Sequence, residues 1–360
     1  MTKLARLLVG PIALLAAGAA LPAPSTAWAA PPAPGPAAPA PRVAVTPPMP
    51  FQDQERAAFL LSTLARFARQ APNRTPFELR FEAALSQHPS ARAAALRIVE
   101  KYEHMTVDRR RLLLGSHHDA TTRAFTDAQA LSLAKGAVAS GSAHPVGAKP
   151  PNVVVTYAGL GCTKTYEPVD AAFGAVYVFH DSPTQPTVTR IKLPGGGQKI
   201  PNLTPGSYSS VGATTLYTGP SDAGLLFFES LFVDPVSKPD DLNAPFTTVD
   251  EIVDFGVAHA AGAFPPGAAH TGAETLDALA AGLHVLFDIW TKSAEVSSLG
   301  APMRITRIQS AELVAAASAP ELSAGPLHFK LSSKHSEYQT DYSMYFDVSP
   351  AVAFAPKTLH

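Results

Sequence analysis

The sequence predicts an α+β protein in which a small N-terminal helical bundle is followed by an antiparallel β-sandwich with an inserted helical hairpin. Apolar residues recur at helical spacing between residues 51 and 136. From residue 152 onward the period drops to two, and β-branched and aromatic residues become frequent. The 35 prolines disfavour long uninterrupted helices and helical solenoids, so we expect short elements joined by many stiff loops.

Residues 1–29 have the order of regions found in a secretory signal peptide. Lys3 and Arg6 precede an apolar stretch from Leu7 to Leu21, and Ala27-Trp28-Ala29 supplies the small residues that signal peptidase requires. The apolar stretch is shorter than the ~20 residues of a spanning helix, so we expect cleavage after this tripeptide and no transmembrane anchor. We therefore expect a bacterial product that is secreted or located in the periplasm or cell envelope.

Two segments are predicted to be linkers from their composition. Residues 30–50 consist mainly of Pro and Ala, offer few apolar side chains for a core and favour an extended polyproline conformation. Residues 137–151 are rich in Gly, Ser, Ala and Pro. We expect the first segment to tether the folded body and the second to join the helical region to the β-rich domain.

The helical region, residues 51–136, is predicted to contain five helices. The sequence from Thr75 to Glu78 has a cap residue, a proline at the first helical position and a glutamate three residues after the cap, which predicts a capping box. Thr106 is the predicted cap of the stretch VDRRRLLL, which ends at Gly115. The sequence leaves open whether this region is an independent domain or a pro-segment removed on maturation.

Residues 152–350 are predicted to form the β-sandwich-like domain, with a helical insertion at residues 248–295. Short strands separated by Pro- and Gly-rich turns are typical of a sandwich rather than a parallel sheet. Thr248 is the predicted cap of the first inserted helix, and residues 273–295 form the second. The expected strands are residues 153–157, 175–179, 187–193, 213–217, 225–232, 303–308, 327–331 and 338–348.

Charge and cysteine content exclude some classes of protein. The signal peptide holds two of the 28 basic residues and no acid, which leaves 26 basic and 29 acidic residues, a net charge of −3 with neutral His. A near-neutral chain of this kind is not expected to bind nucleic acid. The single cysteine, Cys162, excludes an internal disulfide. Its neighbours resemble a strand, so we expect a buried, unreactive thiol rather than a nucleophile.

The most conspicuous polar cluster is His117-His118-Asp119, which follows a predicted helix end. Two imidazoles and a carboxylate are zinc ligands, and the same groups can form a general base with its orienting acid. Adjacent histidines rarely point at one ion, and no HExxH or His-x-His partner lies nearby. We therefore favour a polar, solvated loop over a metal site.

A second cluster is acidic. Asp234, Asp240 and Asp241 lie in or next to the loop that precedes the helical insertion, and Asp250 and Glu251 follow at the predicted helix start. Calcium takes six to eight oxygen ligands, which loops at the end of a sandwich can supply. No D-x-D-x-D run is present, and acids are favoured at a helix N-terminus in any case. Surface and helix-dipole roles are therefore favoured over calcium binding.

Other chemistry has less support. The sequence contains no G-x-S-x-G nucleophile elbow. Four carboxylates are available for a glycosidase-type pair, but any protein of this size offers as many. Four tyrosines are available for a carbohydrate platform, although Tyr at alternating strand positions is more often a packing residue. These two sets are Glu167, Asp170, Asp181 and Glu229, and Tyr157, Tyr177, Tyr208 and Tyr217.

The function favoured by the sequence is that of a secreted or cell-envelope binding protein whose β-sandwich holds a protein, carbohydrate or other envelope ligand. The alternative is a secreted hydrolase that depends on a metal bound by His117, His118 and Asp119. Calcium and zinc are the two metals that the residues leave open. The residues carry no signature of a named family.

Overall fold

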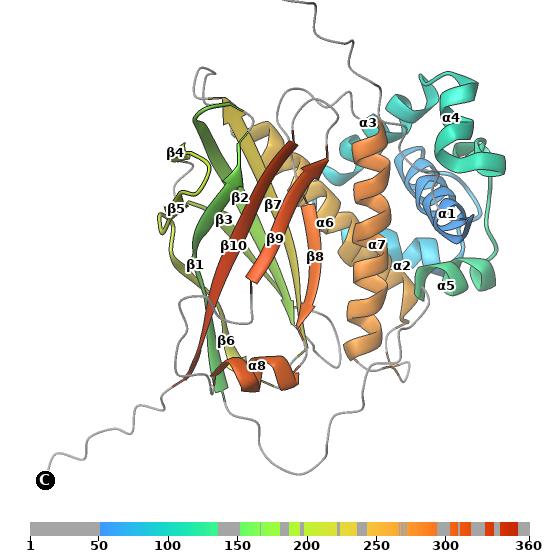
Figure 1. Cartoon of the computed structure of the whole chain (residues 1–360). Coiled ribbons are helices and arrows are strands. Elements are labelled where there is room, and N and C mark those ends of the chain that lie inside the picture. Colours follow the sequence, from blue (N-terminus) through green and yellow to red (C-terminus); the bar gives the residue numbers. More distant parts are fainter. Residues whose placement is uncertain are drawn as a thin grey trace, which may run out of the picture. The chain divides into compact units, whose positions relative to one another are not determined.

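The computed structural model (Figure 1) describes residues 51–135, 152–165, 167–180, 187–194, 198–221, 224–235, 243–265, 272–293, 303–308, 310–317, 328–334 and 339–351, together with residues 267 and 270. The chain divides into two units, Met1–Pro41 and Arg42–His360. All described residues belong to the second unit. The predicted signal peptide, tether and linker lie outside the described residues.

The predicted α+β class is confirmed, because a series of helices precedes two antiparallel sheets (Figure 1). Thr75 forms the predicted capping box with Glu78, and the Thr106 hydroxyl accepts a hydrogen bond from the Arg109 amide. Gly115 ends its helix with a positive φ of 53°, a conformation that glycine adopts at little cost. The helices of this region are α1 (Phe51–Ala68), α2 (Pro76–Leu85), α3 (Ala91–Glu103), α4 (Val107–Leu114) and α5 (Asp127–Lys135), with short 3₁₀ helices η1 (Gly115–His117) and η2 (Ala120–Thr122).

The strands form two five-stranded antiparallel sheets. Sheet A has the order β5-β1-β10-β9, with β6 also paired to β1, and sheet B has the order β3-β2-β7-β8, with β4 also paired to β2. Sheet A consists of β1 (Asn152–Lys164), β5 (Tyr208–Ser209), β6 (Thr214–Pro220), β9 (His328–Lys334) and β10 (Gln339–Pro350). Sheet B consists of β2 (Asp170–His180), β3 (Thr187–Leu193), β4 (Ile200–Leu203), β7 (Leu225–Pro235) and β8 (Met303–Ile308).

Alternate side chains of both sheets share one buried cluster. Tyr157 of β1 and Phe346 of β10 meet there, with ring centroids 6.0 Å apart. Phe227 of β7, in sheet B, packs on the same Phe346, with ring centroids 5.7 Å apart. A short helix, α8 (Ser310–Ala317), contributes Leu313 and Ala316 to the same cluster. The inner faces of the two sheets therefore form a common core.

The opposite face of sheet B is covered by the inserted hairpin, α6 (Asn243–Ala263) and α7 (Gly272–Ser293). The insertion joins β7 to β8, which pair directly with each other. The predicted cap at Thr248 is wrong, because α6 begins at Asn243 and Thr248 lies inside it. Pro245 lies in the first turn of this helix, where backbone amides have no hydrogen-bond partner within the helix. The missing amide hydrogen of proline therefore costs no hydrogen bond there.

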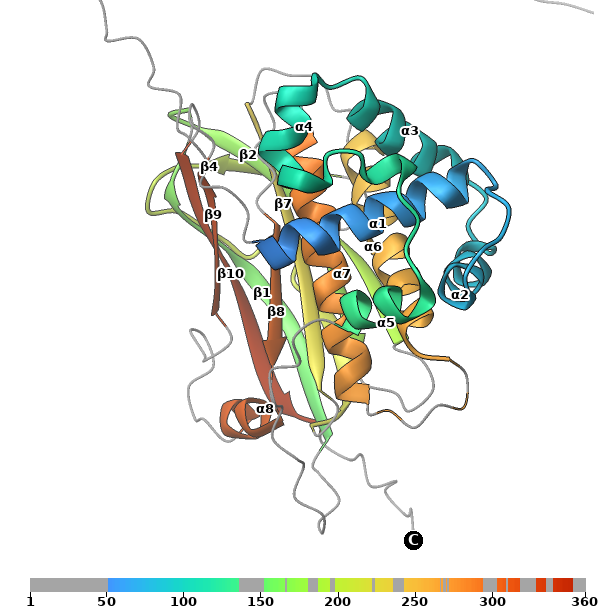
Figure 2. The same cartoon turned by 90° about the vertical axis from the view of Figure 1, so that its right-hand side faces the viewer.

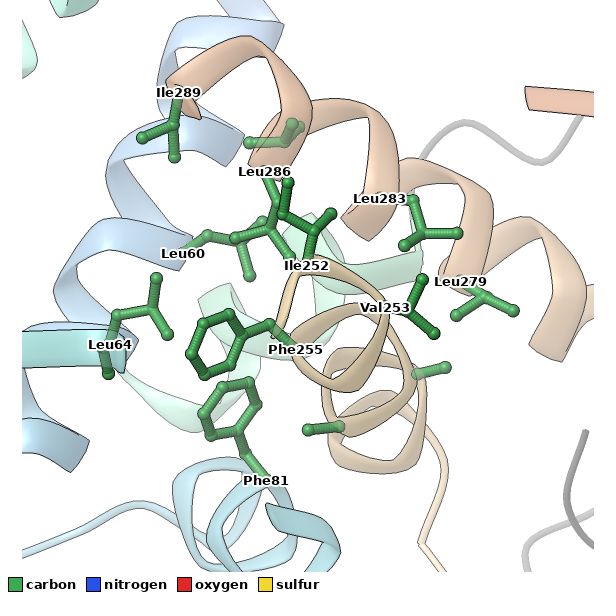
Figure 3. Close-up of a cluster of buried hydrophobic side chains, with 14 of the residues drawn as sticks. Leu60, Leu64, Phe81, Ile252, Val253, Phe255, Leu279, Leu283, Leu286 and Ile289 are labelled. Carbon is green, nitrogen blue, oxygen red and sulfur yellow. The ribbon is translucent and has the colours of Figure 1, made fainter. Parts of the chain in front are cut away.

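Helices α1 to α5 pack on the hairpin (Figure 2), and their apolar side chains join one cluster with the outer face of sheet B. Figure 3 shows Leu60 and Phe81 of the N-terminal helices close to Phe255 of α6 and Leu286 of α7. The Arg80 guanidinium also donates two hydrogen bonds, of 3.0 and 2.8 Å, to the carbonyl of Gly262. The helical region thus shares its core with the hairpin and sheet B.

Several short elements had no clear signal in the sequence. These are α8, β4 and the two-residue β5. Strand β1 also extends beyond the expected residues 153–157, through Gly159 and Gly161, to Lys164. None of the helices in the described part of the chain is long and apolar enough to span a membrane.

Candidate functional site

The outer face of sheet A differs from the other three sheet faces. The buried cluster under the helices contains residues of sheet B and none of sheet A. On β10, Tyr342, Met344 and Phe346 are buried in the core between the sheets. Because successive side chains of a strand point to opposite faces, Tyr345 and Asp347 project from the outer face. This face therefore carries polar and aromatic side chains.

Two glycines of β1 lie beneath two tyrosine rings on this face. A Cβ atom added at Gly159 would lie 2.5 Å from the hydroxyl oxygen of Tyr208. A Cβ atom added at Gly161 would lie 2.8 Å from Cε2 of Tyr345. At Gly159 the carbonyl oxygen of Ser209 would be equally close, at 2.5 Å. Each tyrosine ring therefore lies directly on the strand. We call the group Gly159, Gly161, Tyr208, Tyr345 and Asp347 the tyrosine face.

The two rings also hold each other. Their centroids are 5.5 Å apart and their planes are inclined at 73°, an edge-to-face arrangement. Strand pairing explains the contact, since Tyr208 is opposite Gly161 and Tyr345 is opposite Gly159 across β1. Tyr208 nevertheless keeps 55% of its surface exposed. One ring is thus fixed in place by packing while much of it remains accessible.

The protonation states on the tyrosine face follow from partial burial. Burial raises the pKa of the Tyr208 phenol, and the nearby charges of Asp347 and Tyr345 raise it further. The phenol is therefore a hydrogen-bond donor at neutral pH. Burial also raises the pKa of Asp347. The face presents an aromatic surface, a hydroxyl group and a carboxyl group close together.

The structure separates the roles of the three residues in the His117-His118-Asp119 cluster. His117 is buried, and its Nδ1 lies 2.6 Å from Nη1 of Arg123. The carbonyl of His118 accepts a hydrogen bond from the Tyr102 hydroxyl, and the carbonyl of Asp119 accepts one from the Thr122 amide. Within the described residues, no group of three His, Cys, Asp or Glu side chains could hold a metal ion. The loop is less solvated than expected because His117 packs inward.

The acidic cluster falls partly outside the described residues. Asp240 and Asp241 lie in such a segment, and Asp234 is part of β7 but its side chain is not described. Asp250 and Glu251 lie about two turns inside α6, so the proposed helix-dipole role is wrong, because that effect falls off within the first turn.

The carboxylates of α6 contact cations of the protein itself. Asp250 accepts a hydrogen bond of 2.6 Å from the Tyr177 hydroxyl and pairs with Arg190. Glu251 pairs with Arg97 of α3. Asp254 pairs with Arg190 of β3. These acids therefore connect α6 to its neighbours.

Two of the four candidate catalytic carboxylates and the thiol lie in the core. Asp170 is buried and accepts a hydrogen bond of 2.7 Å from the Tyr342 hydroxyl. Burial raises the pKa of Glu229 well above its usual range, despite the opposing effect of Arg304. Cys162 is buried in β1 as expected, and burial raises the pKa of its thiol. A buried thiol with a raised pKa is a poor nucleophile.

Some of the remaining candidate residues are exposed and others are buried. Glu167 precedes β2, and its amide donates to the Asp170 carboxylate, whereas Asp181 lies outside the described residues. Tyr157 and Tyr177 are buried packing residues, and Tyr217 donates a hydrogen bond to the carbonyl of Pro220. Tyr208 alone of these four tyrosines is mainly exposed.

Tyr345 was not considered as a site residue from the sequence. It is separated from the buried Tyr342 by an odd number of positions on a strand, which places the two side chains on opposite faces of the sheet. This spacing is the feature of the sequence that indicates an outward-facing Tyr345. The pairing of β5 with β1, which brings Tyr208 to it, has no local signature. The chain matches no protein-family model, and neither curated proteins nor solved structures gave a match to it.

Proposed function

We propose that this chain is an exported carbohydrate-binding protein without catalytic activity, which holds a polysaccharide chain on the tyrosine face. The observation that carries the proposal is the position of Tyr208. Its ring is 55% exposed, is packed edge-to-face on Tyr345 and lies over a strand whose glycines leave room for both rings. A flat, fixed and accessible aromatic ring is the surface on which the C–H face of a sugar ring stacks.

Physical chemistry favours a sugar ligand for this arrangement. Stacking buries apolar surface on both partners, and the rigid rings lose little conformational entropy when they bind. The sugar hydroxyls need hydrogen-bond partners, which the Tyr208 phenol and the Asp347 carboxyl supply at the edge of the ring. The surface is a strand face rather than a deep pocket, which suits an extended chain better than a small molecule.

Export is part of the proposal and depends on residues 1–29. A basic start, an apolar stretch and a small-residue cleavage site would deliver the body to a compartment that contains structural polysaccharides. The Pro/Ala-rich residues 30–50 would then serve as a spacer. The N-terminal sequence of the product recovered from the medium or periplasm tests this step. A product that begins at Met1 in the cytosol would contradict it.

The binding proposal is tested by electrophoresis of the exported protein through native gels that contain soluble α-glucan, β-glucan, xylan or mannan. Co-sedimentation with insoluble peptidoglycan, chitin and cellulose completes the panel. We expect retardation or sedimentation by at least one polymer, about tenfold weaker in Tyr208→Ala because stacking area is lost. Tyr208→Phe keeps the ring and most of the affinity.

The matched control is Leu79→Ala, because Leu79 is also exposed, at 54%, but lies on α2 of the helical region. It should bind as the unmodified chain does. Equal binding by Tyr208→Ala, or no binding to any polymer of the panel, contradicts the proposal. Hydrolysis of a bound polymer that is lost in His118→Ala would contradict its non-catalytic part.

A further inference from the structure

A second exposed feature lies on the helical side of the body and takes no part in the proposed binding of polysaccharide. Helix α4 has the sequence VDRRRLLL. Leu112 on this helix is 79% exposed, the highest value among the large apolar side chains of the described residues. Arg109 and Arg111, which both precede it in the sequence, are exposed as well. An exposed leucine next to exposed arginines combines apolar surface with positive charge.

The rest of α4 fixes this helix to the body. Leu114 is buried, and Leu113 packs against the helical core. The guanidinium of Arg110 lies over the ring of Tyr102, 5.9 Å from its centroid. The helix is thus anchored along one side, and Arg109, Arg111 and Leu112 remain on its exposed surface.

The positive charge at this surface is not neutralised by a strong ion pair. Arg111 lies 3.9 Å from Asp108, and the two side chains are 59% and 93% exposed. Solvent screens a pair of this kind, which contributes little. A partner that carries a dense negative charge would therefore gain electrostatic energy from both Arg109 and Arg111.

The position of α4 adds a second argument. Gly115, which caps α4, has the side chain of Gln54 in the first turn of α1 beside it, 2.7 Å from where a Cβ atom would lie. The first turn of α1 therefore lies next to the end of α4. Sheet A, with the tyrosine face, is separated from helices α1 to α7 by sheet B (Figures 1 and 2).

We propose that α4 is the contact point between this protein and an anionic phospholipid surface. Arg109 and Arg111 pair with headgroup phosphates, and Leu112 enters the boundary between the headgroups and the acyl chains. Helix α4 lacks the apolar stripe of three or more turns with which a helix fills a protein groove, which favours a lipid surface over an acidic protein. The tyrosine face then points away from the membrane.

The test is co-sedimentation of the exported protein with vesicles of phosphatidylcholine alone or mixed equally with phosphatidylglycerol. We expect binding to the mixed vesicles only, and release by high salt, which screens the arginines. Leu112→Asp and the double variant Arg109→Glu/Arg111→Glu should each lower the partition coefficient about tenfold or more. Leu112→Ala provides a milder variant, and thermal melts followed by circular dichroism confirm that each variant is folded.

Leu79→Asp is the matched control, because it places the same charge at another exposed leucine and should leave binding unchanged. The mass of the protein is measured first, since an uncleaved apolar leader would itself bind vesicles. Whichever N-terminus is found, the comparison of the Leu112 and Leu79 variants decides the outcome. Equal partition of these two variants, equal binding to neutral vesicles or no binding overturns the proposal. None of these results would affect polysaccharide binding by the tyrosine face.

Discussion

Sheet A and sheet B have the same number of strands but different surroundings. Sheet B is covered on one face by sheet A and on the other by α6 and α7, so nearly every side chain of β2 and β7 is buried. On β10 of sheet A, buried residues alternate with partly exposed ones from Met344 to Ser349. A sheet with two buried faces serves as a scaffold, whereas a sheet with one open face can hold a ligand.

Gly174 of sheet B and Gly161 of sheet A have different neighbours. Gly174 of β2 has a backbone neighbour, since a Cβ atom there would lie 2.5 Å from the carbonyl oxygen of Ser230. At Gly161 of β1 the neighbour is the ring of Tyr345. Gly174 thus allows close backbone approach, whereas Gly161 makes space for an aromatic ring. Gly159 of β1 does both, because a Cβ atom there would lie 2.5 Å from the carbonyl oxygen of Ser209 and from the Tyr208 hydroxyl oxygen.

The largest expected effect lies on the helix-facing side of sheet B. Phe228 of β7 is fully buried there against Tyr177, with ring centroids 5.9 Å apart. Phe228→Ala should lower the free energy of unfolding by about 3–5 kcal/mol, because it leaves a cavity in a packed core. Thr215→Ala, on an exposed residue paired with Thr156 in sheet A, should change it by less than about 0.5 kcal/mol. Urea unfolding measures both changes in unfolding free energy. Similar values for the two variants would contradict the conclusion that sheet B is buried on both faces and sheet A on one.

A pH effect is expected from the helical core behind sheet B. Burial lowers the pKa of His259 to about 4, and its Nε2 contacts the carbonyl of Ala134 at 3.0 Å. Between pH 6.5 and 4 the unfolded chain binds a proton that the folded chain excludes, so stability falls as the pH falls through this window. The loss should reach about 2–3 kcal/mol.

His259→Phe removes this titration and should flatten that part of the curve. Urea midpoints at pH 7 and pH 4.5 measure the difference between the two proteins. Glu229, whose raised pKa makes stability decrease as the pH rises, is present in both proteins and cancels in the comparison. If the stability of the two proteins changed equally between pH 7 and pH 4.5, His259 would not be buried as described.

The two glycines give a matched pair of smaller effects. Gly174→Ala should cost about 2–3 kcal/mol, because the Ser230 backbone cannot move aside. Gly161→Ala should cost about 1 kcal/mol, since the Tyr345 ring can rotate away. Binding should show the reverse order, with polysaccharide affinity lost in Gly161→Ala and kept in Gly174→Ala. Loss of affinity in both variants would indicate a general structural defect instead.

The smallest effect on stability is expected on the tyrosine face itself. Tyr208→Ala removes a half-exposed ring and one edge-to-face contact, so unfolding should become easier by less than about 1 kcal/mol. The same change should remove most of the polysaccharide affinity. A thermal melt together with affinity electrophoresis measures both quantities. A large drop in melting temperature would assign Tyr208 a packing role.

The scaffold was more predictable from the sequence than the site. The capping box at Thr75 and the apolar run of β7 are local signals, and both were confirmed. A strand was expected around Cys162, but its continuity with residues 153–157 was not, because Gly159 and Gly161 weaken strand propensity and their partners are far away in the chain. Tyr208 and Tyr345 meet only through the pairing of β5 and β10 with β1. Long-range register of this kind has no local signature.

The most direct measurement is nitration of tyrosines by tetranitromethane, mapped by mass spectrometry with and without a bound polysaccharide. Among the tyrosines with described side chains, Tyr102, Tyr157, Tyr177 and Tyr342 are buried, and Tyr208 is the most exposed. We predict that, among the tyrosines with described side chains, Tyr208 is nitrated first in the free protein and is protected by the polymer that binds. Bound polymer that leaves the nitration of Tyr208 unchanged would contradict the assignment of the open face of sheet A as the binding site.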